Sequence, residues 1–301
     1  MRYLSGLLIV ASLTLSTPAW AVVILDSTWE AEGGSEAAWG EGFGSARALA
    51  AEPQFDAVVG LEGTFSGDVH FGCSSTWLGN SEDGNAFLLS AAHCFNANLD
   101  PSAWDYVTVA GNYLQAKTVT RHPLYDDDRD ETGGYDMAIV ELDGPIDDSG
   151  EPPLLYAGSD ELGHVATMVG FGTRGTAAYG EDRKFNTTTD KAAAHNVIDI
   201  ASEPVDDGDG GNVLQTDFDG PDGEGNTLEG DAAPVDALEG MIALGDSGGS
   251  LWIETEDGWR IAGVNVASDV MSGYGMIDDF ARVSTQLDWI QSIFPDAQTG
   301  E

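Results

Sequence analysis

The stretch Gly245-Asp246-Ser247-Gly248-Gly249 carries the most specific signal in this chain of 301 residues. A nucleophilic serine needs its hydroxyl exposed on a tight turn, with backbone N–H groups available to hold a developing oxyanion. The flanking glycines permit such a turn because they tolerate backbone conformations that a side chain forbids. Ser247 is therefore the candidate nucleophile.

The same five residues also fit the Gly-x-Ser-x-Gly elbow of α/β-hydrolases, and the order of the histidines separates the two possibilities. In that class the catalytic histidine follows the serine along the chain. Here all five histidines precede the serine: His70, His93, His122, His164 and His195. The sequence thus excludes the elbow.

His93 is the candidate base because of its neighbours. The motif Ala91-Ala92-His93-Cys94 follows an apolar strand predicted over residues 87–89. The only other cysteine is Cys73. A disulfide between the two would tether His93 across about twenty residues and contribute about 3 kcal/mol. Two unrelated buried thiols are the alternative, and the remaining histidines are predicted to be structural.

Asp136 is the candidate third member of a catalytic group. It opens a strand predicted over residues 136–142, whose alternation places Asp136 on the same face as Ala138, Val140 and Leu142. A charged side chain on an apolar face needs a buried partner, and an imidazole N–H would serve. Such a carboxylate would hold the imidazole in the tautomer that a general base requires.

The wider pattern favours an all-β fold with one helix at its end. Short apolar strands separated by turn signals are predicted at residues 57–61, 86–89, 106–109, 137–140, 165–170, 250–253 and 261–266. Near the end, Val283, Leu287, Ile290 and Phe294 recur at helical spacing before Pro295. Many short strands with one closing helix indicate a barrel or a sandwich.

Four motifs in order make the chain resemble the chymotrypsin/trypsin-type serine peptidases: Ala91-Ala92-His93-Cys94, His122-Pro123-x-Tyr125, Tyr135-Asp136-Met137-Ala138 and Gly245-Asp246-Ser247-Gly248-Gly249. The resemblance covers residues 53–294. It implies two antiparallel β-barrels, with His93 and Asp136 on the first and Ser247 on the second. It also implies a Cys73–Cys94 disulfide and oxyanion donors at the N–H groups of Gly245 and Ser247.

The reaction that the resemblance implies is hydrolysis of peptide bonds by a secreted serine endopeptidase, through an acyl-enzyme and without a required cofactor. The alternative is a catalytically silent, peptidase-like binding protein. Because His93 must be neutral to accept a proton, we expect activity to rise with pH through about 6.5–7.

The resemblance also identifies a specificity pocket, formed by Met241, Ile242, Val266 and Ser268. Met241 stands six residues before Ser247, at the expected pocket floor, and brings no carboxylate for lysine or arginine. An apolar residue before the cleaved bond is therefore expected. A carboxylate at Asp278 or Asp279, approaching from the opposite wall, would change that expectation.

The N-terminus predicts export. Residues 1–21 read as a signal peptide, with Arg2, an apolar core and a cleavage site after Ala21. Residues 22–52 lack a sustained period and are interpreted as an extension or pro-segment. Residues 53–301 form the predicted peptidase domain, whose two halves meet near residues 150–165. The destination is extracellular or periplasmic.

The family's usual Ile-Val-Gly-Gly activation sequence has no clean match. The new amine of that sequence pairs with the aspartate before the catalytic serine, which corresponds to Asp246 here. Val22-Val23, which signal cleavage would free, offers the apolar pair without the glycines.

Charge narrows the range of partners. The chain has 52 acidic and 11 basic residues, a formal net charge of −41, which disfavours nucleic acid and anionic membranes. Asp outnumbers Glu by 33 to 19, which is consistent with a surface adapted to salt or with a merely acidic secreted protein. Two acidic loops, at residues 126–131 and 206–231, are candidate calcium sites. The expected partner is a protein or peptide substrate, and the expected state is a monomer.

Overall fold

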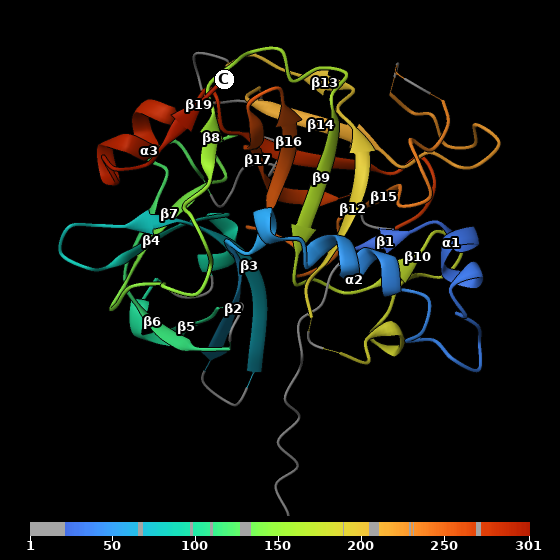
Figure 1. Cartoon of the computed structure of the whole chain (residues 1–301), viewed down its shortest axis with the longest axis horizontal. Coiled ribbons are helices and arrows are strands. Elements are labelled where there is room, and N and C mark those ends of the chain that lie inside the picture. The colour runs from blue at the N-terminus through green and yellow to red at the C-terminus, as the bar shows by residue number, and fades with distance from the viewer. Residues whose placement is uncertain are drawn as a thin grey trace, which may run out of the picture.

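Two β-sheets, each built from one half of the chain, form the body of the protein (Figure 1). This computed structural model describes residues 22–301 except 66–68, 97–98, 109–110, 127–133, 189, 205–210, 229, 231 and 269–271. The predicted signal peptide therefore lies outside the described residues. None of the described helices is long and apolar enough to span a bilayer.

The first sheet closes into a barrel in the order β2-β3-β4-β7-β6-β5. Its strands are β2 (Val58–Phe65), β3 (Val69–Asn80), β4 (Ala86–Ser90), β5 (Trp104–Val107), β6 (Tyr113–Arg121) and β7 (Ala138–Leu142). The interior is apolar, with Leu61, Leu88 and Ile139 buried in one core. Closure leaves no unpaired edge, so each strand end is held in a fixed place.

The second sheet follows the order β12-β9-β16-β17-β18-β14-β13, and β8 pairs with both β17 and β19. Its strands are β8 (Leu154–Tyr156), β9 (Val165–Gly170), β12 (Ala192–Val197), β13 (Ile200–Ala201), β14 (Val213–Asp217), β16 (Ser250–Thr255), β17 (Gly258–Ser268), β18 (Ile277–Arg282) and β19 (Thr299–Gly300). A closed barrel joined to a half-barrel sheet confirms the predicted double-barrel, all-β fold.

The segment 22–52 is folded onto the second half. It contains β1 (Val23–Ile24), α1 (Asp26–Ala31) and α2 (Gly44–Ala50), and Trp29 and Phe43 are buried in the core of the second sheet. A small sheet joins β1 to β15 (Gly240–Met241) and β10 (Gly175–Thr176), and β10 pairs with β11 (Gly180–Glu181). The sequence lacks a periodic signal here because helices of this length depend on tertiary packing.

The C-terminal helix α3 (Leu287–Ile293) is shorter than the pattern from Val283 predicts. The Val283 N–H donates to the carbonyl of Ala262 at 2.9 Å, so strand pairing with β17 holds this residue outside the helix. After the helix, Phe294 stacks on Phe87 of β4 with ring centroids 4.5 Å apart. The segment after the helix thereby packs against the first barrel, whereas the last strand, β19, pairs with β8 (Figure 1). Single 3₁₀ turns lie at η1 (Pro53–Phe55), η2 (His93–Phe95), η3 (Pro101–Ala103) and η4 (Arg183–Phe185).

Candidate active site

His93 begins the 3₁₀ turn η2, directly after β4 ends at Ser90. Ala91 and Ala92 are both fully buried, so the small side chains let the turn sit tightly against the core. The next residue, Cys94, forms a disulfide with Cys73 of β3. The predicted disulfide is present, and it ties the turn that carries His93 to the neighbouring strand.

Asp136 lies two residues before β7 begins, and its exposed fraction is 0%. One carboxylate oxygen accepts the backbone N–H of His93 at 2.9 Å. The other lies 2.6 Å from Nδ1 of the His93 ring. When Nδ1 carries the proton and donates to Asp136, Nε2 is left as an acceptor.

Ser247 lies on a turn that depends on glycine. Gly245 and Gly248 have φ values of 100° and 82°, in the left-handed region that side chains disfavour. The carbonyl of Ser247 accepts the backbone N–H of Ser74 at 2.8 Å, which joins the turn to β3 of the first barrel. Among the described residues, no acceptor is hydrogen bonded to the N–H of Gly245 or Ser247. Both donors are thus available to a ligand.

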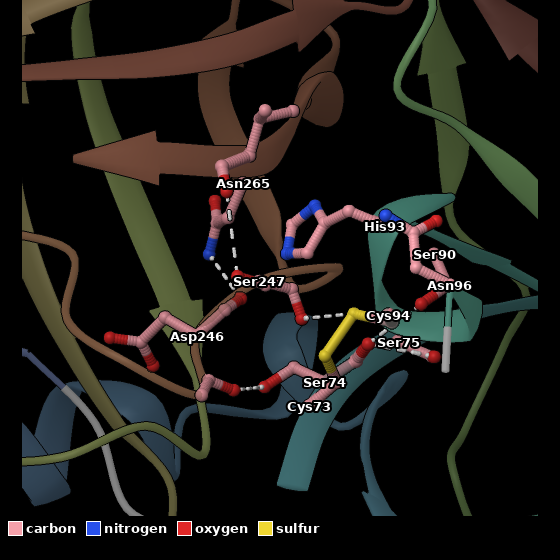
Figure 2. Close-up of a disulfide and its surroundings, with 12 residues drawn as sticks. Cys73, Ser74, Ser75, Ser90, His93, Cys94, Asn96, Asp246, Ser247 and Asn265 are labelled. Carbon is pink, nitrogen blue, oxygen red and sulfur yellow. Dashed lines mark hydrogen bonds between the residues drawn. A yellow bond between two sulfur atoms is a disulfide. The ribbon is translucent and has the colours of Figure 1, made fainter. Parts of the chain in front are cut away.

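The disulfide lies close to both the Ser247 turn and His93 (Figure 2). Sγ of Cys94 lies 3.7 Å from the carbonyl oxygen of Ser247. A ring nitrogen of His93 lies within 4.8 Å of the sulfur atoms of Cys73 and Cys94. The Ser247 hydroxyl donates to the carbonyl of Val266 at 3.4 Å, which is long for a hydroxyl donor.

Asp246 is fully buried behind Ser247 and accepts three backbone N–H groups, from Val22 at 3.1 Å, Gly172 at 2.8 Å and Ala243 at 2.9 Å. Removal from water raises the pKa of Asp246 to about 7, although the three donors oppose that rise. The contact with Val22 spans 224 positions. In the sequence, only the Val22-Val23 pair pointed to a contact between this segment and Asp246.

The four residues predicted for the specificity pocket lie on two elements. Met241 ends β15 and is fully buried, and Ile242 follows it with an exposed fraction of 2%. Val266 lies on β17, and Ser268 ends that strand, with its side chain outside the described residues. The sequence left open whether Asp278 or Asp279 approaches the pocket. In the structure, the carboxylate of Asp278 accepts the backbone N–H of Ile242.

Two other histidines, His122 and His195, have contacts typical of a structural role. His122 is buried between the rings of Tyr135 and Trp289, with centroids 4.9 and 4.7 Å away, and burial lowers its pKa to about 4. His195 pairs with Asp236, whose side chain is 46% exposed, at 2.7 Å. In the part of the chain that the structure describes, neither contacts Ser247.

The described residues contain one group of side chains close enough to share a metal ion, Cys73, His93 and Cys94. Its two sulfur atoms form the disulfide and so offer no thiolate. The first acidic loop lies mostly outside the described residues, and the second is described only in part. Calcium binding there stays a prediction.

A sequence model of one protein family, described as Trypsin, matches residues 83–290, which is more than half of the chain. The matched range contains His93, Asp136 and Ser247, and it spans the boundary between the two sheets. The match agrees with the double-barrel fold and with the resemblance seen in the four sequence motifs. The chain belongs to the trypsin family of serine peptidases.

Proposed function

We propose that this protein is a secreted serine endopeptidase that hydrolyses peptide bonds with Ser247 as nucleophile, His93 as general base and Asp136 as its carboxylate partner. The observation that carries the proposal is the pair of contacts from His93 to the buried carboxylate of Asp136, at 2.9 and 2.6 Å, beside a glycine-bounded serine turn. Family membership supports protein or peptide substrates.

The reaction proceeds in two halves. Nε2 of His93 takes the hydroxyl proton as Ser247 Oγ attacks the substrate carbonyl carbon, and Asp136 stabilises the resulting imidazolium. The N–H groups of Gly245 and Ser247 hold the oxyanion. His93 then gives its proton to the leaving amine, which leaves an acyl-enzyme. Water, activated by the same imidazole, hydrolyses the ester and restores Ser247.

The serine hydroxyl is held only weakly in this structure. Its bond to the Val266 carbonyl is long at 3.4 Å, so a rotation about Cα–Cβ toward His93 gives up little. Catalytic hydrogen bonds are often loose before substrate binds and shorten in the complex.

Labelling with an alkyl fluorophosphonate tests the proposal against the alternative of a silent binding protein. Wild-type protein should be labelled at one site and should hydrolyse peptides, and Ser247→Ala should lose both properties while keeping its circular dichroism spectrum. Both assays are run at low salt and at molar KCl, because the acidic surface affects stability. Folded wild-type protein that resists the label in both solutions would refute the enzymatic role.

We also propose that cleavage after Ala21 completes the site. The Val22 nitrogen already lies 3.1 Å from the buried carboxylate of Asp246, and the freed amine would place a positive charge there. Val22 has a φ of 61°, which is strained for a β-branched residue. Because φ exists only while residue 21 is attached, cleavage at this bond removes that strain.

Two forms of the chain that differ by one residue test this second proposal. One begins at Val22 and the other carries a single glycine before it. The extended form should react with the fluorophosphonate at least about 100-fold more slowly, because a buried ion pair loses one partner. Equal labelling rates, or N-terminal sequencing of active protein that starts elsewhere, would contradict it.

A further inference from the structure

The backbone of Leu244, just before the serine turn, is held by two hydrogen bonds. Leu244 is 67% exposed, so packing of its side chain holds it only weakly. Its carbonyl accepts the N–H of Thr173 at 2.7 Å. Its N–H donates to Oε2 of Glu181, also at 2.7 Å. Both polar backbone groups of Leu244 are thus fixed from one stretch of chain, residues 173–181.

The peptide group after Leu244 supplies one of the two oxyanion donors proposed above. Its carbonyl belongs to Leu244 and its N–H to Gly245, and the two point in opposite directions within one rigid plane. Gly245 has a φ of 100°, and glycine tolerates more than one orientation of that plane. The Thr173 bond holds the carbonyl of this peptide, and the Glu181 bond holds the N–H on the other side of the Leu244 Cα. Together they fix the direction in which the Gly245 N–H points.

Glu181 is itself held in place by the small sheet. It ends β11, which pairs with β10, and β10 pairs in turn with β1 (Figure 1). The two strands of this hairpin approach closely at Gly175, where an added Cβ would lie 2.3 Å from the carbonyl oxygen of Gly180. Gly175 is the register partner of Glu181. The backbone of Glu181 therefore has a fixed position, although the residue is exposed.

The carboxylate of Glu181 also acts on the serine turn through its charge. Burial is the main cause of the raised pKa of Asp246, and the charge of Glu181 adds to that rise. A negative charge near the oxyanion hole opposes the charge that develops there. Any benefit from Glu181 must therefore come from its hydrogen bond to Leu244. Replacement by glutamine separates the two effects, because it keeps an oxygen acceptor and removes the charge.

We propose that Glu181 is a positioning residue for the oxyanion hole: its carboxylate anchors Leu244, so that the N–H of Gly245 points at the substrate carbonyl. This inference rests on the proposed peptidase function and adds a residue to that same site. Glu181 acts through Leu244 and not on the reacting atoms. The motif around Ser247 carries no signal for it, because the contact spans 63 positions.

Three variants test the proposal by steady-state hydrolysis of a peptide p-nitroanilide. Glu181→Ala should lower kcat about 10-fold and change KM less than about twofold, because a bond that orients an oxyanion donor is lost. Glu181→Gln should restore kcat to within about threefold of wild type. Glu32→Ala is the matched control, since Glu32 is another exposed glutamate that accepts a backbone N–H, from Ser45 at 3.1 Å. It should leave kcat unchanged.

Two inhibitors separate positioning from a general loss of structure. A peptide aldehyde adds to Ser247 as a hemiacetal whose oxygen lies in the oxyanion hole, so its Ki should rise about 10-fold in Glu181→Ala. The corresponding peptide alcohol forms no such adduct, and its Ki should stay within about twofold. Equal shifts for the two inhibitors would overturn the role of Glu181. Equal losses of kcat in Glu181→Ala and Glu181→Gln would also overturn it.

Fluorophosphonate labelling distinguishes this failure from failure of the proposed function. Glu181→Ala should be labelled about 10-fold more slowly than wild type, because the phosphoryl oxygen occupies the same hole. Wild-type protein and Glu181→Ala labelled at equal rates would overturn the role of Glu181 and leave the peptidase function intact. Folded wild-type protein that is never labelled would instead overturn the peptidase function itself.

Discussion

Asp136 and Asp246 are both fully buried aspartates at the candidate site, yet they are held in different ways. The carboxylate of Asp136 makes two polar contacts with His93 of its own barrel, 43 positions away. Asp246 is held by backbone N–H groups from three segments, one of them 224 positions away. The His93–Asp136 half of the candidate site lies within one barrel, whereas Asp246 takes one of its donors from Val22, far away along the chain.

The largest effect should come from removing the charge of Asp136. Asp136→Asn should lower kcat about 10⁴-fold, because an amide no longer favours the tautomer in which Nε2 accepts the serine proton. Asp236→Asn is the matched control, since Asp236 also pairs with a histidine but is partly exposed. It should change kcat within about twofold. Equal losses in the two variants, measured by steady-state hydrolysis, would remove the distinction between these pairs.

The next effect concerns the disulfide, which only the first barrel has. Replacing both Cys73 and Cys94 by alanine should lower the free energy of unfolding by about 3 kcal/mol, because the bond closes a loop with a sequence separation of 21. Denaturant unfolding measures the loss. Hydrogen exchange should show faster opening of β3 and β4 than of β16 and β17. Uniform acceleration across both sheets would argue that the halves do not differ in this respect.

A further effect, comparable in size to that of the disulfide, is the pH dependence of stability contributed by Asp246. In the uncleaved chain, burial raises the folded-state pKa of Asp246 to about 7, above the unfolded value near 3.9. We expect a shift in the same direction in the chain with one glycine before Val22, because Val22 still offers a peptide N–H. The folded state then binds more protons, so stability should fall as pH rises from about 4 to 7. In the form that begins at Val22, the ammonium keeps the carboxylate charged and this fall should vanish. Melting temperatures of the two forms across that range decide the matter, and parallel curves would count against the ion pair.

Prediction from sequence worked best where the pattern is carried by neighbouring residues. The strand at residues 165–170 has the predicted bounds, and the barrel strands β2, β4, β5 and β7 overlap the predicted apolar runs. The barrel strands β3 and β6 were not predicted. His93, Asp136 and Ser247 each stood in a short motif with a local reason for its residue types. Such local patterns predict structure well because turns and strand alternation depend on residues close together in the chain.

Prediction failed where distant packing decides the structure. Residues 26–31 and 44–50 form helices with no periodic signal, because Trp29 and Phe43 are buried against the second sheet. The C-terminal helix begins at Leu287 because Val283 is still bonded to β17. Apolar spacing alone cannot show whether such a residue belongs to a helix or pairs with a strand.

The amino-acid sequence by itself determined the family, the glycine-bounded serine turn and the identity of the histidine and aspartate beside it, since each depends on residue type and local order. Only the tertiary structure decided that Val22 lies against Asp246 and that Asp278, and not Asp279, meets Ile242. The second of these contacts depends on strand register, in which a shift of one residue turns a side chain to the other face of the sheet. No local stretch of sequence encodes that register.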